Sequence, residues 1–292
     1  MKLKDEDVKI FYKLHPALLF YTNQKTKLIK DVSTVEELRS LPIERLSSVM
    51  DSLCDNTGLI DSFVKDNPFD FSLEELKIVQ SWKNMIKGKF FVVRYLKKYA
   101  IFHEADSPYA FGVVAITNEF EEILGSQLPI LVETILLSFK GRITYSAFMK
   151  SSRITFGSGI RQSINDSYQK AKAEYGIITV LPFTKDKEKQ SEEELLKFYL
   201  KSKTNREYYE EEIWGLIDTN PALLTLYHLE MGKINSRYYK RKLKENGITK
   251  GLFGLLEDTV VSTGKTKRTV EETIEEIVPP GKRDFVYIFK LG

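Results

Sequence analysis

The sequence predicts an α+β protein: a helical N-terminal layer on a mostly antiparallel, strand-rich domain, followed by a helical C-terminal domain with helix-turn-helix character. Three observations lead to this prediction. Residues 89–183 concentrate short β-branched and aromatic runs separated by turn residues. Helical spacing of apolar residues dominates on both sides of that block. The charged run 184–190 contains no apolar residue and marks a boundary. We therefore place domains at 1–86, 87–184 and 191–292.

The composition limits the classes of function that we consider. The chain has 292 residues, enough for about two domains, and its net charge of +3 is too small to predict nucleic-acid binding by the whole surface. A single cysteine, Cys54, excludes an intrachain disulfide and fits a reducing, cytoplasmic compartment. We expect no signal peptide and no membrane span, because no stretch is long and apolar enough. Three histidines without ligand spacing predict no metal site, and we expect no cofactor.

Residues 1–86 are expected to be helical. Short helices are predicted at 35–40, 43–53 and 59–64. The dipeptide His15-Pro16 is expected to break the first apolar segment. The sequence Ser72-Leu-Glu-Glu75 is a capping box, so a longer helix is expected to begin there.

The strand-rich block follows. Strands are predicted at 89–96, 99–103, 109–117, 130–139, 142–148, 153–156 and 177–181. Lys140-Gly141 lies between two of them and indicates a hairpin. Apolar residues from Ile160 to Tyr175 recur at helical spacing, with Ser158 placed to cap the helix and Gly176 to end it. Antiparallel strands with one covering helix fit an α+β domain, for which a partly closed barrel is one arrangement.

Two runs in this region carry a resemblance. NPFDFSLEELKIVQSW at residues 67–82 and GKFFVVRYLKK at 88–98 resemble a segment of an uncharacterised bacterial protein family of unknown function. The resemblance covers about residues 67–181. It implies a recurring domain and carries over no functional residue.

The C-terminal half contains a pattern typical of a helix-turn-helix. Asn220-Pro221 can open one helix, Gly232 is expected to end it, and Asn235 is expected to cap a second helix that ends before Gly247. Residues 259–270 have two β-branched arms around Gly264, which predicts a hairpin like the wing of winged-helix proteins. The tip of this hairpin is basic: Lys265, Lys267 and Arg268. An apolar strand at 285–291 is expected to pair with a sheet.

The predicted second helix is strongly basic. Arg237, Lys240, Arg241 and Lys244 recur at i, i+3, i+4 and i+7, so they share one side of a helix. Such a stripe can contact phosphates and base edges of DNA or RNA. The alternative is a solvated face balanced by nearby acids, such as those at 207–212.

Three polar residues of the strand-rich block are weak candidates for catalysis: Arg94, His103 and Glu133. Arg94 and Glu133 are charges inside apolar strands, where they can pair in the core, lie on a strand face exposed to water, or supply an acid/base group. The leading hypothesis is a non-enzymatic binding or regulatory protein that contacts nucleic acid through its C-terminal half. The alternatives are an enzyme with its site at these three residues, and a module that binds a protein partner.

Overall fold

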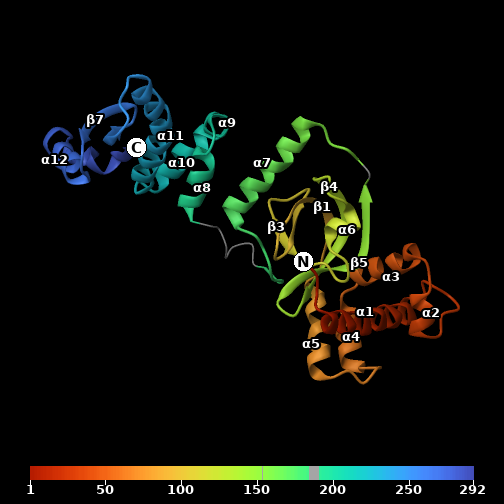
Figure 1. Cartoon of the computed structure of the whole chain (residues 1–292). Coiled ribbons are helices and arrows are strands. Elements are labelled where there is room, and N and C mark those ends of the chain that lie inside the picture. The colour runs from red at the N-terminus through yellow and green to blue at the C-terminus, as the bar shows by residue number, and fades with distance from the viewer. Residues whose placement is uncertain (153, 184–190) are drawn as a thin grey trace. The chain divides into compact units, whose positions relative to one another are not determined.

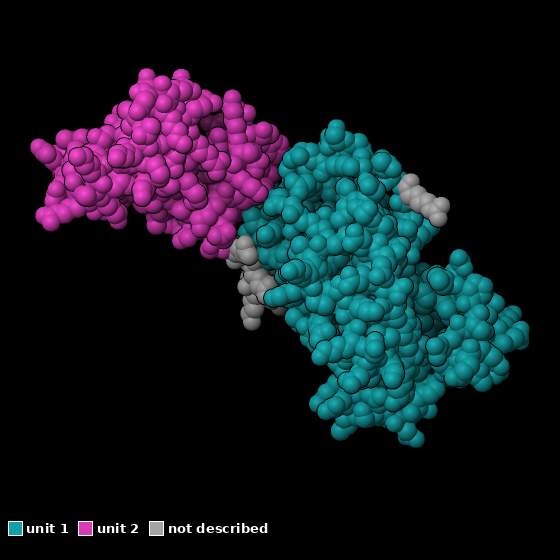
Figure 2. Space-filling view, in the orientation of Figure 1, with its two compact units in different colours: residues 1–188 teal, residues 189–292 magenta. Residues whose placement is uncertain are grey.

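A computed structural model of the chain describes residues 1–152, 154–183 and 191–292. The chain divides into two compact units, residues 1–188 and 189–292 (Figure 1, Figure 2). Both units contain helices and strands, so the predicted mixture of α and β structure is confirmed. The run 184–190, where the sequence predicts the domain boundary, lies outside the described residues. No helix within the described ranges combines the length and the apolarity needed to cross a membrane.

Unit 1 begins with a layer of helices, drawn in red and orange in Figure 1. They are α1 (Asp5–Thr26), α2 (Val35–Arg39), α3 (Ile43–Asp55), α4 (Gly58–Asp66), α5 (Leu73–Ser81) and the 3-10 turn η1 (Trp82–Asn84). The predicted capping box opens α5, because Ser72 Oγ accepts from the Glu75 N–H and the Glu75 carboxylate accepts from the Ser72 N–H. In contrast, α1 runs through Pro16. The middle of α1 is buried, and this packing offsets the hydrogen bond that proline removes.

The strands of unit 1 close into a five-stranded barrel in the order β1-β2-β3-β5-β4. The elements are β1 (Ile86–Tyr95), β2 (Ala100–Glu104), β3 (Ala110–Val113), α6 (Phe120–Leu124), β4 (Ile130–Phe139) and β5 (Arg142–Ser152). Neighbouring strands are antiparallel except β3 and β5, which pair in parallel at Val113 and Ile143. The buried side chains of the barrel and of the helical layer form one continuous core, and the Trp82 indole donates to the Ser138 carbonyl across the boundary (2.9 Å).

This strand order matches the OB barrel, a five-stranded Greek-key barrel that binds oligonucleotides or oligosaccharides on its β2–β3 face in many proteins. The short helix α6 lies between β3 and β4 along the chain. Its Phe120 is buried. The centre of the Phe120 ring lies 5.0 Å from that of Phe102 and 5.4 Å from that of Tyr145. A fold does not fix a function, so the barrel alone assigns no ligand.

The predicted amphipathic helix is confirmed as α7 (Ser158–Tyr175), although Gly157 rather than Ser158 is its N-cap. It covers the outer side of β1–β3, because Tyr168 and Ala171 pack against Ile101 and Ala110. The face that carries the ligand in OB barrels is therefore occupied by a helix of the same chain. The two short strands predicted beside α7 are absent from the described residues there: 154–156 form no strand, and Ile178 makes a single bridge to Phe111.

Unit 2 places a small sheet between two helices. Its elements are α8 (Glu192–Leu200), α9 (Lys203–Tyr208), α10 (Glu210–Thr219), α11 (Leu223–Glu245), β6 (Gly251–Leu256), β7 (Thr259–Gly264), α12 (Lys267–Ile277), η2 (Pro280–Phe285) and β8 (Tyr287–Leu291). The antiparallel sheet has the order β7-β6-β8, so the C-terminal strand pairs within this unit. One face packs on α11 through Phe253 and Phe289, and the other packs on α12 through Val270 and Ile274.

The predicted helix-turn-helix is wrong, because one helix, α11, spans the expected turn. Gly232 lies inside α11 and is buried against β8. A Cβ at this position would be only 2.4 Å from the Cβ of Tyr287, so the glycine serves close packing between helix and strand. Asn235 is also within the helix, where its side chain donates to the Glu257 carbonyl.

The predicted wing is also wrong. The hairpin turn lies at Glu257 and Asp258, between β6 and β7, and Glu257 adopts a positive φ of 55°. Gly264 instead ends β7. Residues expected at a hairpin tip therefore lie at the start of α12, which Thr266 caps by accepting from the Thr269 N–H.

Candidate functional site

The second half of α11 packs on the sheet with one side and leaves the opposite side exposed. Tyr239 and Leu243 pack on the apolar cluster of the sheet. The Tyr239 hydroxyl also donates to the Asp258 carbonyl in the β6–β7 turn. Ser236 is buried on the same side of the helix. Because these residues recur at three- and four-residue spacing, the opposite side of α11 is left to solvent.

The predicted basic stripe lies along that exposed side and one of its flanks. Arg237, Arg241 and Lys244 are exposed, whereas Lys240 is half-buried with its ammonium 5.7 Å from the centre of the Phe289 ring. Arg241 lies 3.7 Å from a carboxylate oxygen of Glu245, one turn away. Exposed pairs of this kind contribute about 0–1 kcal/mol, so they yield readily to a phosphate. Arg237 and Lys244 form no ion pair with any residue that the structure describes.

An aromatic ring accompanies these cations. Tyr238 is 51% exposed, a large fraction for a tyrosine on a helix that packs against a sheet. The Arg241 guanidinium and the Lys242 ammonium lie 5.8 and 5.9 Å from the centre of its ring. Sequence reasoning gave Tyr238 no role. Its position one residue after Arg237 in a basic helix is the signal that could have drawn attention to it.

The other predicted basic residues lie elsewhere. Lys265 precedes α12, and Lys267 and Arg268 are in its first turn. Lys267 pairs with Glu271 at 3.1 Å and Arg268 pairs with Glu272 at 2.7 Å. Since α11 and α12 pack on opposite faces of the sheet, this trio does not extend the surface formed by α11.

Unit 2 also contains a cavity of about 390 Å3 between α9, α10 and α11. Two aromatic rings line it, Trp214 from α10 and Tyr227 from α11, with centroids 5.3 Å apart and planes inclined by 44°. Trp214 is 44% exposed. Neither ring stands out in the sequence, because no local pattern shows that helices separated along the chain leave a hollow beside them.

In unit 1 the structure brings Arg94 and His103 to the same helix. The Arg94 guanidinium is 3.4 Å from the Asn165 amide oxygen and 5.6 Å from the centre of the Tyr168 ring. His103 is buried, with Nδ1 3.1 Å from the Tyr109 carbonyl oxygen and Nε2 2.8 Å from Ser167 Oγ.

The carbonyl oxygen fixes the protonation of His103. Because the Tyr109 carbonyl can only accept, Nδ1 carries the proton and Nε2 accepts from the Ser167 hydroxyl. The pKa of His103 is lowered, and burial is the largest cause of this shift. The ring is therefore neutral near pH 7. Both nitrogens thus have partners that hold the ring beneath α7.

Glu133 is separate from the other two, and its predicted buried pair with Arg94 is wrong. Both side chains are exposed. In the sheet Glu133 is opposite Lys89 on one side and Lys150 on the other, whereas the β1–β4 ladder ends at Val92 and Ile130, before Arg94. The Glu133 side chain lies on the outward side of β4, between buried Val132 and Thr134, which explains a charge within an otherwise apolar strand.

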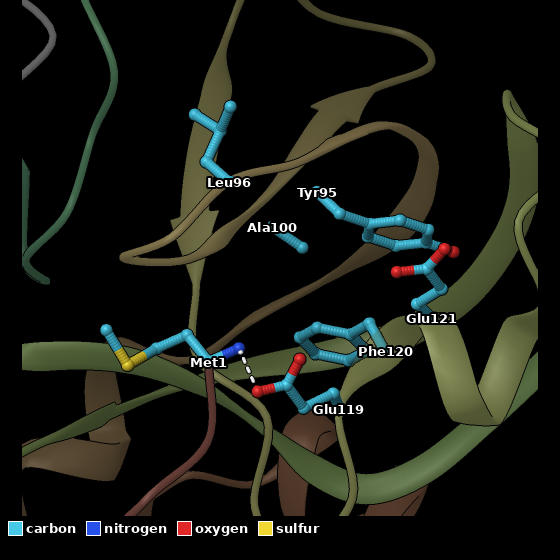
Figure 3. A pocket seen from close by; sticks show the side chains of 7 residues that line it. All are labelled: Met1, Tyr95, Leu96, Ala100, Glu119, Phe120 and Glu121. Carbon is cyan, nitrogen blue, oxygen red and sulfur yellow. Dashed lines mark ion pairs between the residues drawn. The ribbon is translucent and has the colours of Figure 1, made fainter.

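Glu133 instead lines a cavity of about 580 Å3 between α3 and the β4–β5 hairpin. The floor is apolar, with Met50 and Phe148, and Lys87 pairs with Asp51 at 2.7 Å on its rim. A second, smaller cavity of about 180 Å3 lies at one end of the barrel (Figure 3). There the N-terminal amine lies 3.0 Å from Glu119. The smaller cavity is below the usual range for ligand sites, about 300–1,000 Å3.

Cysteine and metal chemistry find no support in the described residues. Burial raises the pKa of Cys54 to about 11, so its thiol is protonated and a poor nucleophile near pH 7. No group of three or more possible metal ligands gathers anywhere in the described ranges.

Comparison of the chain with protein-family models, with curated proteins and with solved structures finds no match. A functional argument therefore rests on the two units themselves.

Proposed function

We propose that unit 2 binds nucleic acid through the exposed side of α11. The observation that carries the proposal is the set of four cations, Arg237, Lys240, Arg241 and Lys244, held at helical spacing on a helix whose opposite side is fixed to a sheet. Phosphates spaced along a nucleic-acid strand match a row of cations, and the release of counterions favours binding. Tyr238 adds a ring on which a base or sugar can pack.

The binding proposed here is led by the phosphate backbone. A helix-turn-helix inserts its second helix into the major groove, but α11 is a single helix and lacks that geometry. Contacts to phosphate position a protein and carry no sequence information. We therefore expect weak dependence on base sequence and strong dependence on salt.

The barrel of unit 1 is a weaker candidate for the same role. Its β2–β3 face would be the place for an oligonucleotide in an OB barrel, but α7 packs there through Tyr168 and Ala171. Binding at that face would require α7 to leave and expose Ile101. The exposed side of α11 needs no such rearrangement.

An enzyme in unit 1 is the second candidate, and one contact favours it. The Ser167 hydroxyl donates to His103 Nε2, an arrangement in which histidine can take the proton of a serine nucleophile. Ser167 lines neither of the unit 1 cavities described above. Arg94 is held by α7, and Glu133 lies elsewhere. Failure of a fluorophosphonate probe to label Ser167 in the full chain would remove this candidate.

The test of the proposal compares two matched variants. In the first, Arg237→Ala, Arg241→Ala and Lys244→Ala are combined; in the second, Lys265→Ala, Lys267→Ala and Arg268→Ala are combined. Each loses three positive charges, but only the first changes the α11 surface. Fluorescence anisotropy with labelled DNA should show at least a tenfold loss for the first variant, about 1.4 kcal/mol or more, and little change for the second.

Salt provides the second readout. If about four phosphates are contacted, the affinity of the wild-type chain should fall by about 10²-fold between about 50 and about 200 mM salt, and the first variant should have a shallower slope. Equal losses in both variants would mean that general charge, not the α11 surface, attracts the nucleic acid. Absence of binding to DNA and RNA at low salt would refute the proposal.

A further inference from the structure

We infer that the cavity between α9, α10 and α11 is a nucleobase pocket, so that unit 2 takes single-stranded rather than duplex nucleic acid. This inference rests on the proposed function and names its ligand class. The cavity, at about 390 Å3, lies within the range of ligand sites, about 300–1,000 Å3, and is large enough for a base. Its lining comes from four helices of one compact unit, since Leu200 ends α8 and the other residues belong to α9, α10 and α11 or begin them.

The walls suit a flat aromatic ligand. Trp214 and Tyr227 are in contact but inclined by 44°, so neither ring covers the face of the other. Trp214 keeps 44% of its surface exposed, whereas its neighbour Ile213 is buried. Stacking on such a ring tolerates any base, because every base has a π face. Leu200, Ile213 and Met231 supply the apolar floor.

The rim offers groups of both charges. Arg206 and Lys203 come from α9, and a carboxylate oxygen of Glu207 lies 3.5 Å from the Lys203 ammonium. Glu210 belongs to the first turn of α10. Carboxylates accept hydrogen bonds from exocyclic amino groups of bases, and cations contact the phosphates that flank them. Burial is the main cause that raises the pKa of Tyr227, so its phenol stays protonated and able to donate.

The cavity and the cationic surface lie along the same helix, α11. Tyr227 lines the cavity, and Tyr238 is the exposed ring among the cations, eleven residues further along the same helix. Eleven residues are about three turns, so the two side chains lie on nearly the same side of α11, about 16 Å apart along its axis. A strand that stacks one base at Trp214 can therefore continue past Tyr238 and Arg241.

This geometry favours single-stranded over duplex nucleic acid. In a duplex the bases are stacked on each other and paired, so none can enter a pocket without a cost of a few kcal/mol for flipping it out. An unpaired strand has its bases free to stack on protein rings. The Trp214 pocket thus discriminates between the two forms, whereas the α11 cations attract both.

Intrinsic fluorescence of the full chain tests the inference directly. The chain has two tryptophans, and Trp82 is buried at 1% exposure, so a ligand at the cavity should change the emission of Trp214 alone. Oligothymidylate should quench this emission, and a duplex of equal length should not. Trp214→Ala should weaken binding of oligothymidylate about tenfold and leave duplex binding unchanged, while Trp214→Phe should retain most of the affinity. Tyr208→Ala is the control, since Tyr208 is 75% exposed on α9 but does not line the cavity.

The outcomes separate this inference from the proposed function. Binding that depends on Arg237, Arg241 and Lys244 but shows no quenching and no effect of Trp214→Ala would overturn the base pocket and leave the cationic surface intact. Absence of any binding would overturn both. Quenching by tetramethylammonium but not by oligothymidylate would make the cavity an aromatic cage for cations, and the inference would then be wrong.

Discussion

At the scale of single residues, His15 links the stability of unit 1 to pH. It is buried among Phe11, Trp82 and Phe148, and its Nε2 has no hydrogen-bond partner in the structure. Burial lowers the pKa of His15 to about 3. Between that value and about 6.5, the unfolded chain binds a proton here and the folded chain does not. His15 therefore lowers the free energy of unfolding of unit 1 progressively as the pH falls from about 6.5 toward about 3.

The first prediction is that His15→Leu reduces this loss. At about pH 5 the wild-type penalty from His15 is about 2 kcal/mol, and leucine removes it together with an unsatisfied buried nitrogen. Urea unfolding at about pH 7.5 and about pH 5, followed by Trp82 emission in a Trp214→Phe background, measures the difference. A residual acid loss is expected, because burial also lowers the pKa of His103 in the same unit.

The control for His15 is in the other unit. Burial also lowers the pKa of His228, which stacks on Phe285 in unit 2. His228→Leu should leave the pH dependence of the Trp82 transition unchanged. If His15→Leu has no more effect than His228→Leu, the acid loss of unit 1 arises from other groups.

A second prediction concerns Ala147, which has a φ of +63° in the bulge of β5 opposite Ile135. A side chain at positive φ costs about 1 kcal/mol relative to glycine. Ala147→Gly should therefore raise the free energy of unfolding of unit 1 by about that amount. Ala110 in β3 provides the comparison, since it is fully buried without positive φ. Ala110→Gly should lower the stability, and a loss of similar size in both variants would contradict the strain at Ala147.

At the scale of elements, two helical glycines with opposite environments give a third prediction. Gly232 in α11 touches Tyr287, and Gly215 in α10 has nothing within 4 Å of an added Cβ. Gly215→Ala should stabilise unit 2 by about 0.5–1 kcal/mol, because alanine favours a helix. Gly232→Ala should destabilise it, since the new methyl group displaces β8 from α11. Thermal unfolding by circular dichroism measures both, and stabilisation by Gly232→Ala would refute the packing argument.

The same glycine explains which elements could be predicted from sequence. The capping box at Ser72 and the amphipathic pattern of α7 are local signals, and the structure confirms both. The sequence predicts a helix end at Gly232, but this glycine contacts Tyr287, far along the chain, which no local sequence pattern includes. The turn between β6 and β7 was missed because Glu257, not a glycine, adopts the positive φ.

Part of the candidate site could likewise be predicted from the sequence, and part could not. Helical spacing alone places Arg237 and Arg241 on one side of α11, and the continuity of the helix through Gly232 does not alter that spacing. The Trp214 cavity could not be predicted, because it exists only where the helices α8 to α11 fail to fill the space between them. Of the alternatives for Arg94 and Glu133, the buried pair is wrong and both side chains are exposed, since apolar neighbours along a strand do not show whether its outer face is covered.

At the scale of the whole molecule, the two units differ in which of their surfaces are exposed to solvent. Unit 1 covers the β2–β3 face of its barrel with α7, and the contacts of His103 with Ser167 and of Arg94 with Asn165 are part of that cover. Unit 2 leaves one side of α11 open along most of its second half. The β2–β3 face of the barrel is thus covered, whereas Arg237, Arg241 and Lys244 on α11 are exposed.

The last prediction is that the two units unfold independently. Each has its own buried core: Leu18 belongs to the core of unit 1, and Leu255 to that of unit 2. Truncation of either to alanine removes a buried side chain and should cost about 2–5 kcal/mol in the unit that contains it. In a Trp214→Phe background only Trp82 emits, so the urea transition of unit 1 can be followed alone. Leu18→Ala should lower its midpoint and Leu255→Ala should leave it unchanged, because units with separate cores need not share a transition. A shift of the Trp82 transition by Leu255→Ala would show instead that the 292 residues unfold as one cooperative body.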